Sequence, residues 1–374
     1  MLEFIIWNGS PEIFSYEQFA LRWYGLLFAL GFLVSQQILY YIYRKEGKPE
    51  KDVDTLTIYM IVATILGARL GHVIFYQPEI IWEAPLSVLL PFEFSPFRFT
   101  GFQGLASHGA AIGILFALWL FSRKKKLGQN YLQILDRIVI LVCITGCFIR
   151  LGNFFNSEII GKPSSNPLSV VFVSKVTESF MRETKDAPCP VAYMEIKKSN
   201  LPMGQNSRVP IDITVLFKKG IPETRARDYL NGQAKYYLTQ LDEFIDEPAT
   251  SPMNYMLVNE GVNLYSAKIQ TFGIARHPAQ LYESISCFIM FAFLLWYWSR
   301  YKINLPEGRI FGMFMIALWS LRFIYEFLKE NQVAFEDQLK LNMGQVLSIP
   351  LIIVGILVLI RSYKKPAAEI QGAP

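Results

Sequence analysis

The sequence is poor in charged residues. Aspartate, glutamate, lysine and arginine make up only 18% of its 374 residues, whereas hydrophobic residues make up 52%. This balance excludes a disordered chain and is unusual for a soluble globular protein. The net charge of +5 does not indicate a nucleic-acid partner, because the lysines and arginines lie largely in loops between apolar runs, as in membrane proteins.

Cysteine is also scarce, and the four cysteines form no disulfide framework. Cys143, Cys147 and Cys287 lie within apolar runs, and Cys189 lies alone in a polar segment. None has the spacing of paired zinc ligands, so we expect small buried side chains and neither metal nor cofactor. The N-terminal sequence MLEFIIWNGSPEIF has no basic region followed by a cleavage site, and we expect no removable signal peptide.

Seven apolar runs recur along the chain, near the length of about twenty residues that a helix needs to cross ~30 Å of hydrocarbon. They cover residues 21–43, 55–76, 108–121, 131–149, 279–298, 310–328 and 346–360. The sequence therefore predicts an all-α polytopic membrane protein with seven transmembrane helices. We expect the Pro- and Phe-rich segment 77–105 to lie in the membrane interface or to dip partway into the bilayer.

Basic loops predict the orientation of these helices. Clusters at 44–51, 123–126, 300–302 and 361–365 follow the first, third, fifth and seventh runs. Because such loops stay in the cytoplasm, the N-terminus is predicted to lie outside and the C-terminus inside. The long polar stretch after the fourth run is then predicted to lie outside.

The apolar and polar stretches predict three regions. Residues 1–161 would form helices one to four, 162–275 an extracytoplasmic α/β head, and 276–374 helices five to seven. Within the head, 209–217 alternates apolar and polar residues like a half-buried strand, and 223–245 has apolar residues at helical spacing. We find no catalytic motif in the head and expect a structural or partner-contacting role.

Ionisable residues gather at the predicted outer ends of six spans. They are Arg22 with Tyr24, Arg69 with His72, His108, the polar residues of 150–158, the segment 276–283, and Arg322 with Glu326 and Lys329. Each has an ordinary explanation alone: Arg322 and Glu326 as a helix ion pair, His72 as a packing residue, Arg69 as an interface anchor. Their convergence at one depth instead indicates a substrate or ion path, and several arginines favour a phosphate.

The segment RLGNFFNSEIIG at 150–161 is the centre of this set. Arg150, Asn153 and Asn156 follow one another at three-residue spacing and would share a helix face. With Glu158, they predict a site for an anionic, membrane-resident substrate, most plausibly a phospholipid head group. His108, at a predicted helix N-terminus, would stay neutral and suit a general base beside a phosphate.

These segments resemble the prolipoprotein diacylglyceryl transferases. The match to their signature G-R-x-G-N-F-x-N-x-E-x-x-G departs only at Ile149, which replaces glycine. Four further blocks are similar and in the same order: RWYG at 22–25, SHGAAIG at 107–113, RHPAQLYE at 276–283 and RFIYEF at 322–327. The resemblance covers the seven spans but not most of 162–270.

The resemblance implies a multi-pass enzyme of the bacterial plasma membrane with its active site toward the outside. Such an enzyme moves the diacylglyceryl group of phosphatidylglycerol onto the lipobox cysteine thiol of a prolipoprotein signal peptide, forming a thioether and releasing glycerol phosphate. The family's essential residues carry over to Tyr24, His108, Arg150, Asn153, Glu158, Gly161, Arg322 and Glu326. Two positions depart: Leu318 where a tyrosine is often found, and Lys329 where arginine is frequent.

The roles implied by this chemistry follow from charge. Arg150 and Arg322 would stabilise the leaving phosphate oxygen, and His108 would take the proton from the attacking thiol, with Glu158 and Glu326 as rivals. Asn153 and Tyr24 could donate hydrogen bonds to phosphate or glycerol hydroxyls. The alternatives are a phospholipid or ion transporter, against which the lack of an internal repeat or midplane cluster speaks, and a non-catalytic scaffold, which leaves the boundary arginines unexplained.

Overall fold

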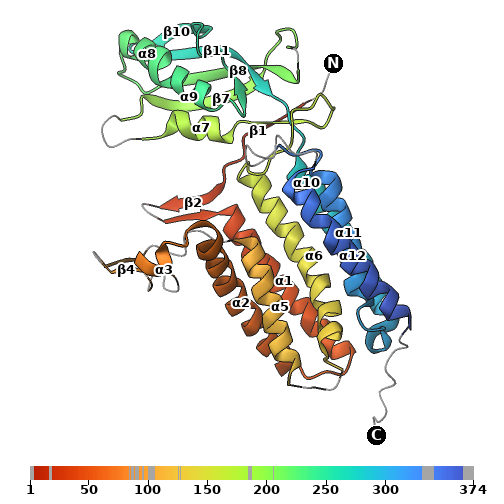
Figure 1. Ribbon diagram of the computed structural model, residues 1–374. Helices are drawn as coiled ribbons and strands as arrows, with labels where there is room; N and C mark the ends of the chain where they lie inside the picture. The colour runs from red at the N-terminus through yellow and green to blue at the C-terminus, as the bar shows by residue number, and fades with distance from the viewer. Residues whose placement is uncertain are drawn as a thin grey trace. The chain divides into compact units, whose positions relative to one another are not determined.

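The computed structural model divides the chain into two compact units (Figure 1). Unit 1 comprises Met1–Leu30, Cys147–Ser286 and Leu321–Val346, and unit 2 comprises Gly31–Gly146, Cys287–Ser320 and Leu347–Pro374. The structure describes residues 4–16, 19–83, 85, 88, 92–94, 97–99, 106–124, 126, 128–183, 188–204, 206–330 and 341–364.

Within the part of the chain that the structure describes, five helices are long and apolar enough to cross a membrane. They are α1 (Trp23–Lys45), α2 (Lys51–Tyr76), α6 (Tyr131–Phe155), α10 (Ala279–Tyr301) and α12 (Met343–Lys364). The expected helical membrane protein is therefore confirmed. The third and sixth apolar runs form the shorter helices α5 (Ser107–Ser122) and α11 (Arg309–Tyr325), so the count of seven spans stays a prediction.

Two helix ends differ from the expected ones. Helix α6 continues to Phe155 rather than ending at residue 149, so Arg150 and Asn153 belong to its last turns. Helix α11 ends at Tyr325, and the prediction that it carries Glu326 and Lys329 is wrong. The chain turns there because Lys329 forms a β-bridge with Gly161, far away in the sequence.

The head in unit 1 is an antiparallel sheet in the order β10 (Tyr255–Gly261), β11 (Leu264–Ile274), β8 (Arg208–Phe217), β7 (Val191–Lys198). The short strand β9 (Ile245–Asp246) pairs with β11. Helices α7 (Ser174–Met181), α8 (Glu223–Tyr229) and α9 (Lys235–Gln240) accompany this sheet (Figure 1). The expected small α/β head is present.

The two elements predicted within the head fared differently. The alternating segment 209–217 lies within β8, and its apolar residues are buried as expected. The predicted helix 223–245 is interrupted by a π-helical turn at Leu230–Ala234 and ends at Gln240. Pairing with β11 holds Ile245 in a strand instead, so tertiary contacts override the helical spacing there.

Short strand pairs flank the head and the helices. In unit 1, β1 (Ile5–Trp7) runs parallel to β6 (Val170–Phe172), and β2 (Glu12–Tyr16) forms a hairpin with β3 (Phe19–Arg22). In unit 2, the segment expected at the membrane interface contains α3 (Ile80–Glu83), β4 (Phe92–Phe94) and β5 (Phe97–Phe99). The rest of that segment lies mostly outside the described residues.

Helices α2 and α5 of unit 2 touch along their backbones (Figure 1). A Cβ atom at Gly109 would lie 2.3 Å from the Gly67 carbonyl oxygen and 2.7 Å from the Gly71 Cα, closer than any side chain can approach. Only glycine permits this contact. It places the start of α5, which carries His108, against the end of α2, which carries Arg69 and His72.

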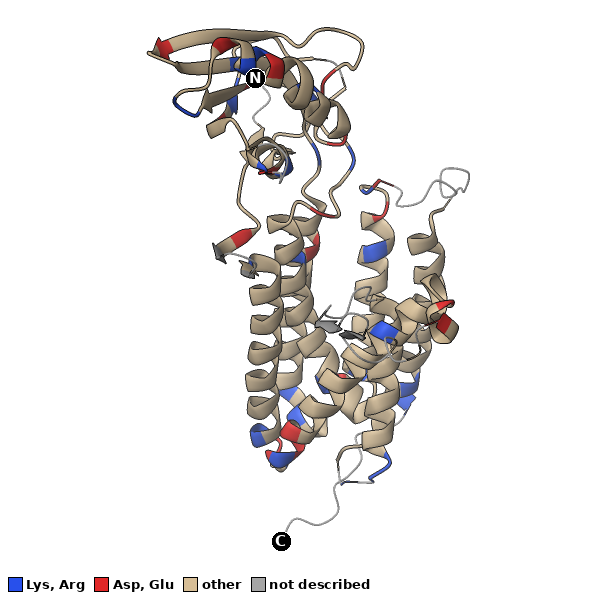
Figure 2. Cartoon of the chain, turned by 90° about the vertical axis from the view of Figure 1, so that its left-hand side faces the viewer, with Lys and Arg blue, Asp and Glu red and all other residues tan. Residues whose placement is uncertain are grey.

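A buried ionic cluster ties together one end of the unit 2 helices. Arg137 donates from Nη2 to Glu46 Oε1 at 2.8 Å, and their side chains are only 3% and 0% exposed. Asp136 lies 3.9 Å from Arg137 and instead accepts hydrogen bonds from the N–H groups of Gly308 and Phe311 at the start of α11. Asp136 and Arg137 therefore keep a long ion pair with each other, while each makes its shorter contacts to a different part of the chain. Figure 2 shows basic and acidic residues together at the lower ends of the helices.

Candidate active site

Unit 1 contains a row of side chains with alternating charge. In spatial order they are Arg150, Glu283, Lys329, Glu326 and Arg322. They come from the end of α6, the first turns of α10, and the end of α11 with the chain that follows it. Three of the predicted site residues, Arg150, Arg322 and Glu326, are thus linked through two residues that were not predicted as part of the site.

Glu283 is the hub of this charged row. Arg150 Nε lies 2.7 Å from Glu283 Oε2, and Lys329 Nζ pairs with Oε1 of the same carboxylate. The Glu283 and Lys329 side chains are 12% and 7% exposed, so water screens this pair poorly. A buried carboxylate between two cations restricts where the Arg150 guanidinium can point.

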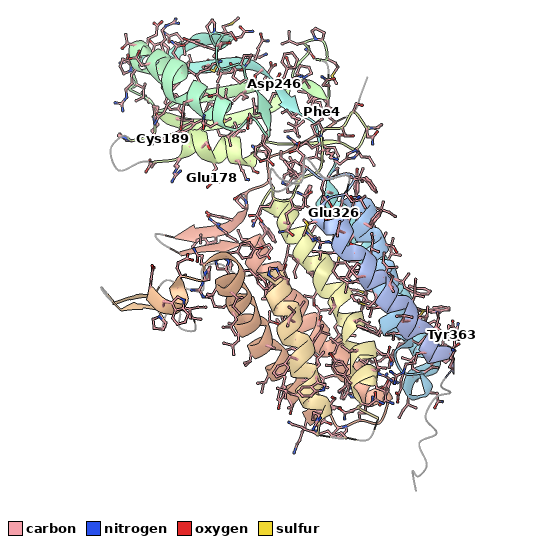
Figure 3. All side chains as sticks on the ribbon, in the orientation of Figure 1. Phe4, Glu178, Cys189, Asp246, Glu326 and Tyr363 are labelled. Atoms are coloured by element: carbon pink, nitrogen blue, oxygen red, sulfur yellow. The ribbon has the colours of Figure 1, made fainter. Side chains whose placement is uncertain are left out.

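Glu326 occupies the equivalent position farther along the charged row. Its Oε1 lies 3.7 Å from Arg322 Nε and 3.9 Å from Lys329 Nζ, and its Oε2 accepts a hydrogen bond of 3.1 Å from Asn342. Figure 3 labels Glu326 near the end of α11. The charged row contains three cations and two carboxylates, an excess of one positive charge, so it retains an attraction for an anion.

Gly161 joins the end of the signature segment to the backbone of two other segments, those containing His277 and Lys329. Its N–H donates to the His277 carbonyl at 3.0 Å, and its β-bridge partner is Lys329. A Cβ atom at this position would lie 2.6 Å from the His277 carbonyl oxygen and 2.9 Å from that of Leu328. Only glycine fits between these two backbone segments, which explains why the signature ends on this residue.

The loop between α6 and Gly161 has an unusual backbone. Ser157 and Ile159 adopt φ angles of 52° and 54°, a left-handed conformation that is rare for a β-branched residue and often found at functional sites. The Glu158 N–H donates to the Asn153 carbonyl, and the Gln280 amide donates to the Glu158 carbonyl. Glu158 itself is exposed, whereas Asn153 is 6% exposed.

Two further predicted residues lie in this part of unit 1. Asn156 donates from Nδ2 to Glu158 Oε1 at 3.3 Å, and its Oδ1 is buried without a hydrogen-bond partner among the described residues. Tyr24 packs on the last turns of α6, where a Cβ at Gly152 would lie 3.0 Å from its ring. The Tyr24 phenol interacts electrostatically with Arg150 and Glu158.

His108 belongs to unit 2, so its predicted place beside Arg150 stays a prediction. As expected, it lies in the first turn of α5. Its ring centroid is 5.1 Å from that of Phe75, and Arg69 donates from Nε to the Val88 carbonyl at 3.2 Å. His72 contacts Gln77 Oε1 at 3.2 Å. These residues gather at the adjoining ends of α2 and α5.

The segment that precedes α10 supports the signature loop. Arg276, 4% exposed, donates to the carbonyls of Glu243 and Gly161 and to Glu330 Oε1. Burial lowers the pKa of His277 below its usual 6.5, so its imidazole is neutral near pH 7. Its ring Nδ1 lies 3.4 Å from the Tyr282 hydroxyl. Arg276 and His277 thus hydrogen-bond to the carbonyl and the N–H of Gly161, respectively.

Sequence reasoning placed Lys329 and the segment 276–283 among the converging ionisable residues but gave neither Glu283 nor Lys329 a role in the site. Glu283 was part of a recognised block, but a carboxylate in the first turns of an apolar helix was itself a signal of an internal partner. Lys329 was treated as a departure from the family pattern. Its pairing with Glu283 depends on a chain reversal after α11, which local spacing did not predict.

Comparison with known proteins agrees with the sequence motifs. The family described as "Prolipoprotein diacylglyceryl transferase" matches residues 11–361. A Bacteroides fragilis protein named phosphatidylglycerol–prolipoprotein diacylglyceryl transferase is 33% identical over 355 residues, 94% of this chain and 93% of the relative. A protein of the same name from Tolumonas auensis is 30% identical over 363 residues, 97% of this chain and 99% of the relative. Another from Chloroherpeton thalassium is 28% identical over 366 residues, 98% of this chain and 97% of the relative.

Proposed function

The chain belongs to the prolipoprotein diacylglyceryl transferase family, and from this membership we propose how its residues carry out the reaction. It is a membrane enzyme that transfers the diacylglyceryl group of phosphatidylglycerol to a prolipoprotein. Transporter and scaffold are set aside because the matched family and relatives are transferases. The acceptor is the thiol of the lipobox cysteine in the signal peptide, and no cofactor takes part.

The reaction breaks the bond between a glycerol carbon and the phosphate oxygen and forms a carbon–sulfur bond. The thiol proton is removed, the thiolate attacks the glycerol carbon, and glycerol phosphate leaves with the electron pair of the broken bond. Negative charge grows on the departing oxygen, so cations fixed beside it lower the barrier. The observation that carries the proposal is the charged row from Arg150 to Arg322, which holds an excess positive charge in a fixed arrangement.

Arg150 and Arg322 bind the phosphate in this proposal. The guanidinium of Arg150 has five donors, and its Nε contact with Glu283 orients the rest of the group. Arg322 is more accessible, with a side chain that is 44% exposed. Glu283 and Lys329 act as positioning residues, because they touch the arginines or their partners rather than the reacting atoms.

Hydrogen bonds from uncharged groups complete the lipid site. In this proposal Asn153 and Asn156, in and beside the last turn of α6, contact the phosphate or glycerol hydroxyls, and so does the Tyr24 phenol, which interacts with Arg150. Gly161 contributes through its backbone fit. This assignment leaves Glu158, which is exposed beside Asn156, to contact substrate at the mouth of the site.

His108 is the proposed general base for the thiol. It lies in the first turn of α5 beside aromatic rings, and histidine is the side chain that most often takes up a proton in general base catalysis. Glu326 is surrounded by Arg322, Lys329 and Asn342 and is assigned a positioning role. Glu158 remains the alternative base.

The proposed topology has seven spans, with the N-terminus outside and the C-terminus inside. Helices α5 and α11, of 16 and 17 residues, extend about 24–26 Å at 1.5 Å per residue and would cross with help from flanking turns. Basic clusters after α1, α5, α10 and α12 then face the cytoplasm. The charged row and the head lie on the outer side of a bacterial plasma membrane. In this topology the first four helices belong to residues 1–161, the head to 162–275 and the last three helices to 276–374.

The test is an assay of the detergent-solubilised protein with phosphatidylglycerol and a lipobox peptide. Formation of a thioether-linked diacylglyceryl peptide is expected. Arg150→Ala and Asn153→Ala should abolish the product while the protein remains in the membrane, whereas Arg227→Ala, which removes an exposed arginine of the head, should leave it unchanged. Normal product from Arg150→Ala would refute the phosphate site, and near-normal product from His108→Gln would refute the base. If reporter tags inserted in the loop 162–275 were found in the cytoplasm, the proposed topology would be refuted.

A further inference from the structure

A pocket of about 420 Å³ opens on the head of unit 1. It lies between the loop that follows Gly161 and the turn that precedes β8, with Phe4 from the N-terminal segment completing one wall. Figure 3 labels Phe4 and Asp246 on this part of the head. The volume falls in the range of small-ligand sites, and none of the residues assigned to the reaction lines the pocket.

The pocket has an apolar floor and an uncharged polar rim. Buried side chains of Phe4, Val209 and Ala275 form the floor. The rim carries hydroxyl and carboxamide groups that can both donate and accept hydrogen bonds; they belong to Ser165, Asn166, Asn206 and Ser207. Such a surface suits a ligand that presents an apolar side chain together with alternating N–H and C=O groups.

A buried hydroxyl in the lining also awaits a partner. Ser169 is 1% exposed, and its Oγ forms no hydrogen bond with the described residues. A buried hydroxyl in this state costs about 1–3 kcal/mol unless something satisfies it. Because the Ser169 Oγ is itself buried, a ligand group reaches it only if the lining moves, and the hydroxyl leaves one unsatisfied polar atom in this wall of the pocket.

Charge argues against a simple anion as the ligand. The one charged residue among the described lining residues is Arg208, and its guanidinium pairs with Asp246, with an Nη2–Oδ1 distance of 3.2 Å. The lining therefore offers no excess positive charge. Polypeptide main chain, which is uncharged and rich in both donors and acceptors, fits better than phosphate.

The pocket lining continues along the chain into the signature segment that ends at Gly161. The Ser164 N–H donates to the Ala275 carbonyl at 2.8 Å, and the Ala275 N–H donates to the Ser207 carbonyl at 3.0 Å. Ser164 is three residues from Gly161, at most about 11 Å along an extended chain. A peptide strand spans that distance with three or four residues.

We infer that this pocket binds the polypeptide of the prolipoprotein a few residues after the acceptor cysteine, seating one apolar side chain on Phe4, Val209 and Ala275. The inference rests on the proposed placement of the reaction at the charged row. It gives the head a role in acceptor recognition: the lipobox reaches the membrane site while the following segment is held on the head. Binding there raises the local concentration of the thiol at the site.

The test compares two acceptor peptides with the full-length enzyme in phosphatidylglycerol nanodiscs. One ends two residues after the cysteine, and the other continues for twelve residues. The wild type should show a KM for the long peptide about tenfold lower than for the short one, as expected for one well-seated side chain. Ser165→Trp, which fills the mouth of the pocket, should bring the ratio of the two KM values close to one.

Ser251→Trp is the matched control, because Ser251 is exposed on the head but does not line the pocket. It should keep the wild-type ratio. A ratio near one in the wild type, or an unchanged ratio in Ser165→Trp, would overturn the inference. Activity on the short peptide tests the proposed reaction site alone, so the two failures are distinguishable.

A second measurement does not depend on a variant folding. A long peptide with a photoreactive residue at the fourth position after the cysteine is irradiated with the wild-type enzyme, and crosslinked segments are identified by mass spectrometry. Crosslinks to 164–169 or 203–209 are expected. Crosslinks confined to the membrane helices would overturn the inference.

Discussion

Glu283 offers the sharpest test of the proposed active site, because it holds two cations at once. In Glu283→Gln the side chain keeps its shape but loses the charge that faces Arg150 at 2.7 Å and the buried ammonium of Lys329. Removing one partner of a buried ion pair costs about 3–5 kcal/mol, since the other charge stays buried alone. Lys329, 7% exposed, would keep only the Glu326 carboxylate at 3.9 Å, so its cost lies toward the lower end of this range, whereas Arg150, 23% exposed, can turn toward water.

The catalytic consequence follows from the position of Arg150. If its guanidinium moves by about 1 Å from the phosphate, a rate loss of about 100-fold is expected, equal to about 2.7 kcal/mol of barrier. The assay measures kcat/KM for phosphatidylglycerol and a lipobox peptide, together with the temperature at which the detergent-solubilised protein unfolds. We expect Glu283→Gln to lower both.

A double variant separates stability from catalysis. Adding Lys329→Met to Glu283→Gln removes the buried ammonium that has lost its nearer carboxylate, so the unfolding temperature should recover while kcat/KM stays low. Glu178→Gln, at an exposed carboxylate on α7 of the head (Figure 3), is the matched control and should leave both quantities unchanged. A Glu283→Gln enzyme with kcat/KM within twofold of the wild type would refute the reasoning.

Three further predictions follow from other contacts. Gly161→Ala places a Cβ 2.6 Å from the His277 carbonyl oxygen. This variant should lose about 1–3 kcal/mol of stability and most of its activity in the peptide assay. The control Gly232→Ala, whose Cβ would have no neighbour within 4 Å, should keep both. Arg137→Met removes the Arg137 hydrogen bonds from the buried Glu46 carboxylate but leaves it the Lys48 ammonium at 2.6 Å, and should lower the free energy of unfolding by about 1–3 kcal/mol, measured by denaturation in detergent. Burial lowers the pKa of His277, so its contribution to stability is present above pH 6.5 and is lost as pH falls through the lowered pKa. The unfolding temperature should therefore fall between pH 7.5 and 5. In His277→Asn this fall in unfolding temperature should be smaller.

Each of these three has a contrary outcome. An active Gly161→Ala enzyme would mean that the backbone contact with His277 is not needed. An Arg137→Met protein as stable as the wild type would mean that the Lys48 ion pair is enough to satisfy the buried Glu46 carboxylate. A stability profile of His277→Asn that falls with pH as steeply as that of the wild type would assign the pH dependence to other groups.

The sequence alone determined the class of the protein and supplied most of the residues of the proposed site. Apolar runs report membrane helices because their length and composition are local properties, and the motif at 150–161 is long enough to identify a family without coordinates. The strand at 209–217 was equally local, since its alternation reflects one buried face. For the same reason Arg150, Asn153 and Gly161 were identified from spacing and resemblance.

The tertiary structure decided which partners these residues have. Glu283 and Lys329 join Arg150 and Glu326 only because the chain turns after Tyr325 and returns past Gly161. In the same way, Arg137 lies closer to Glu46, at 2.8 Å, than to its sequence neighbour Asp136, at 3.9 Å. Ion pairs and backbone contacts between segments a hundred residues apart depend on how the chain folds, and local propensity carries no information about them.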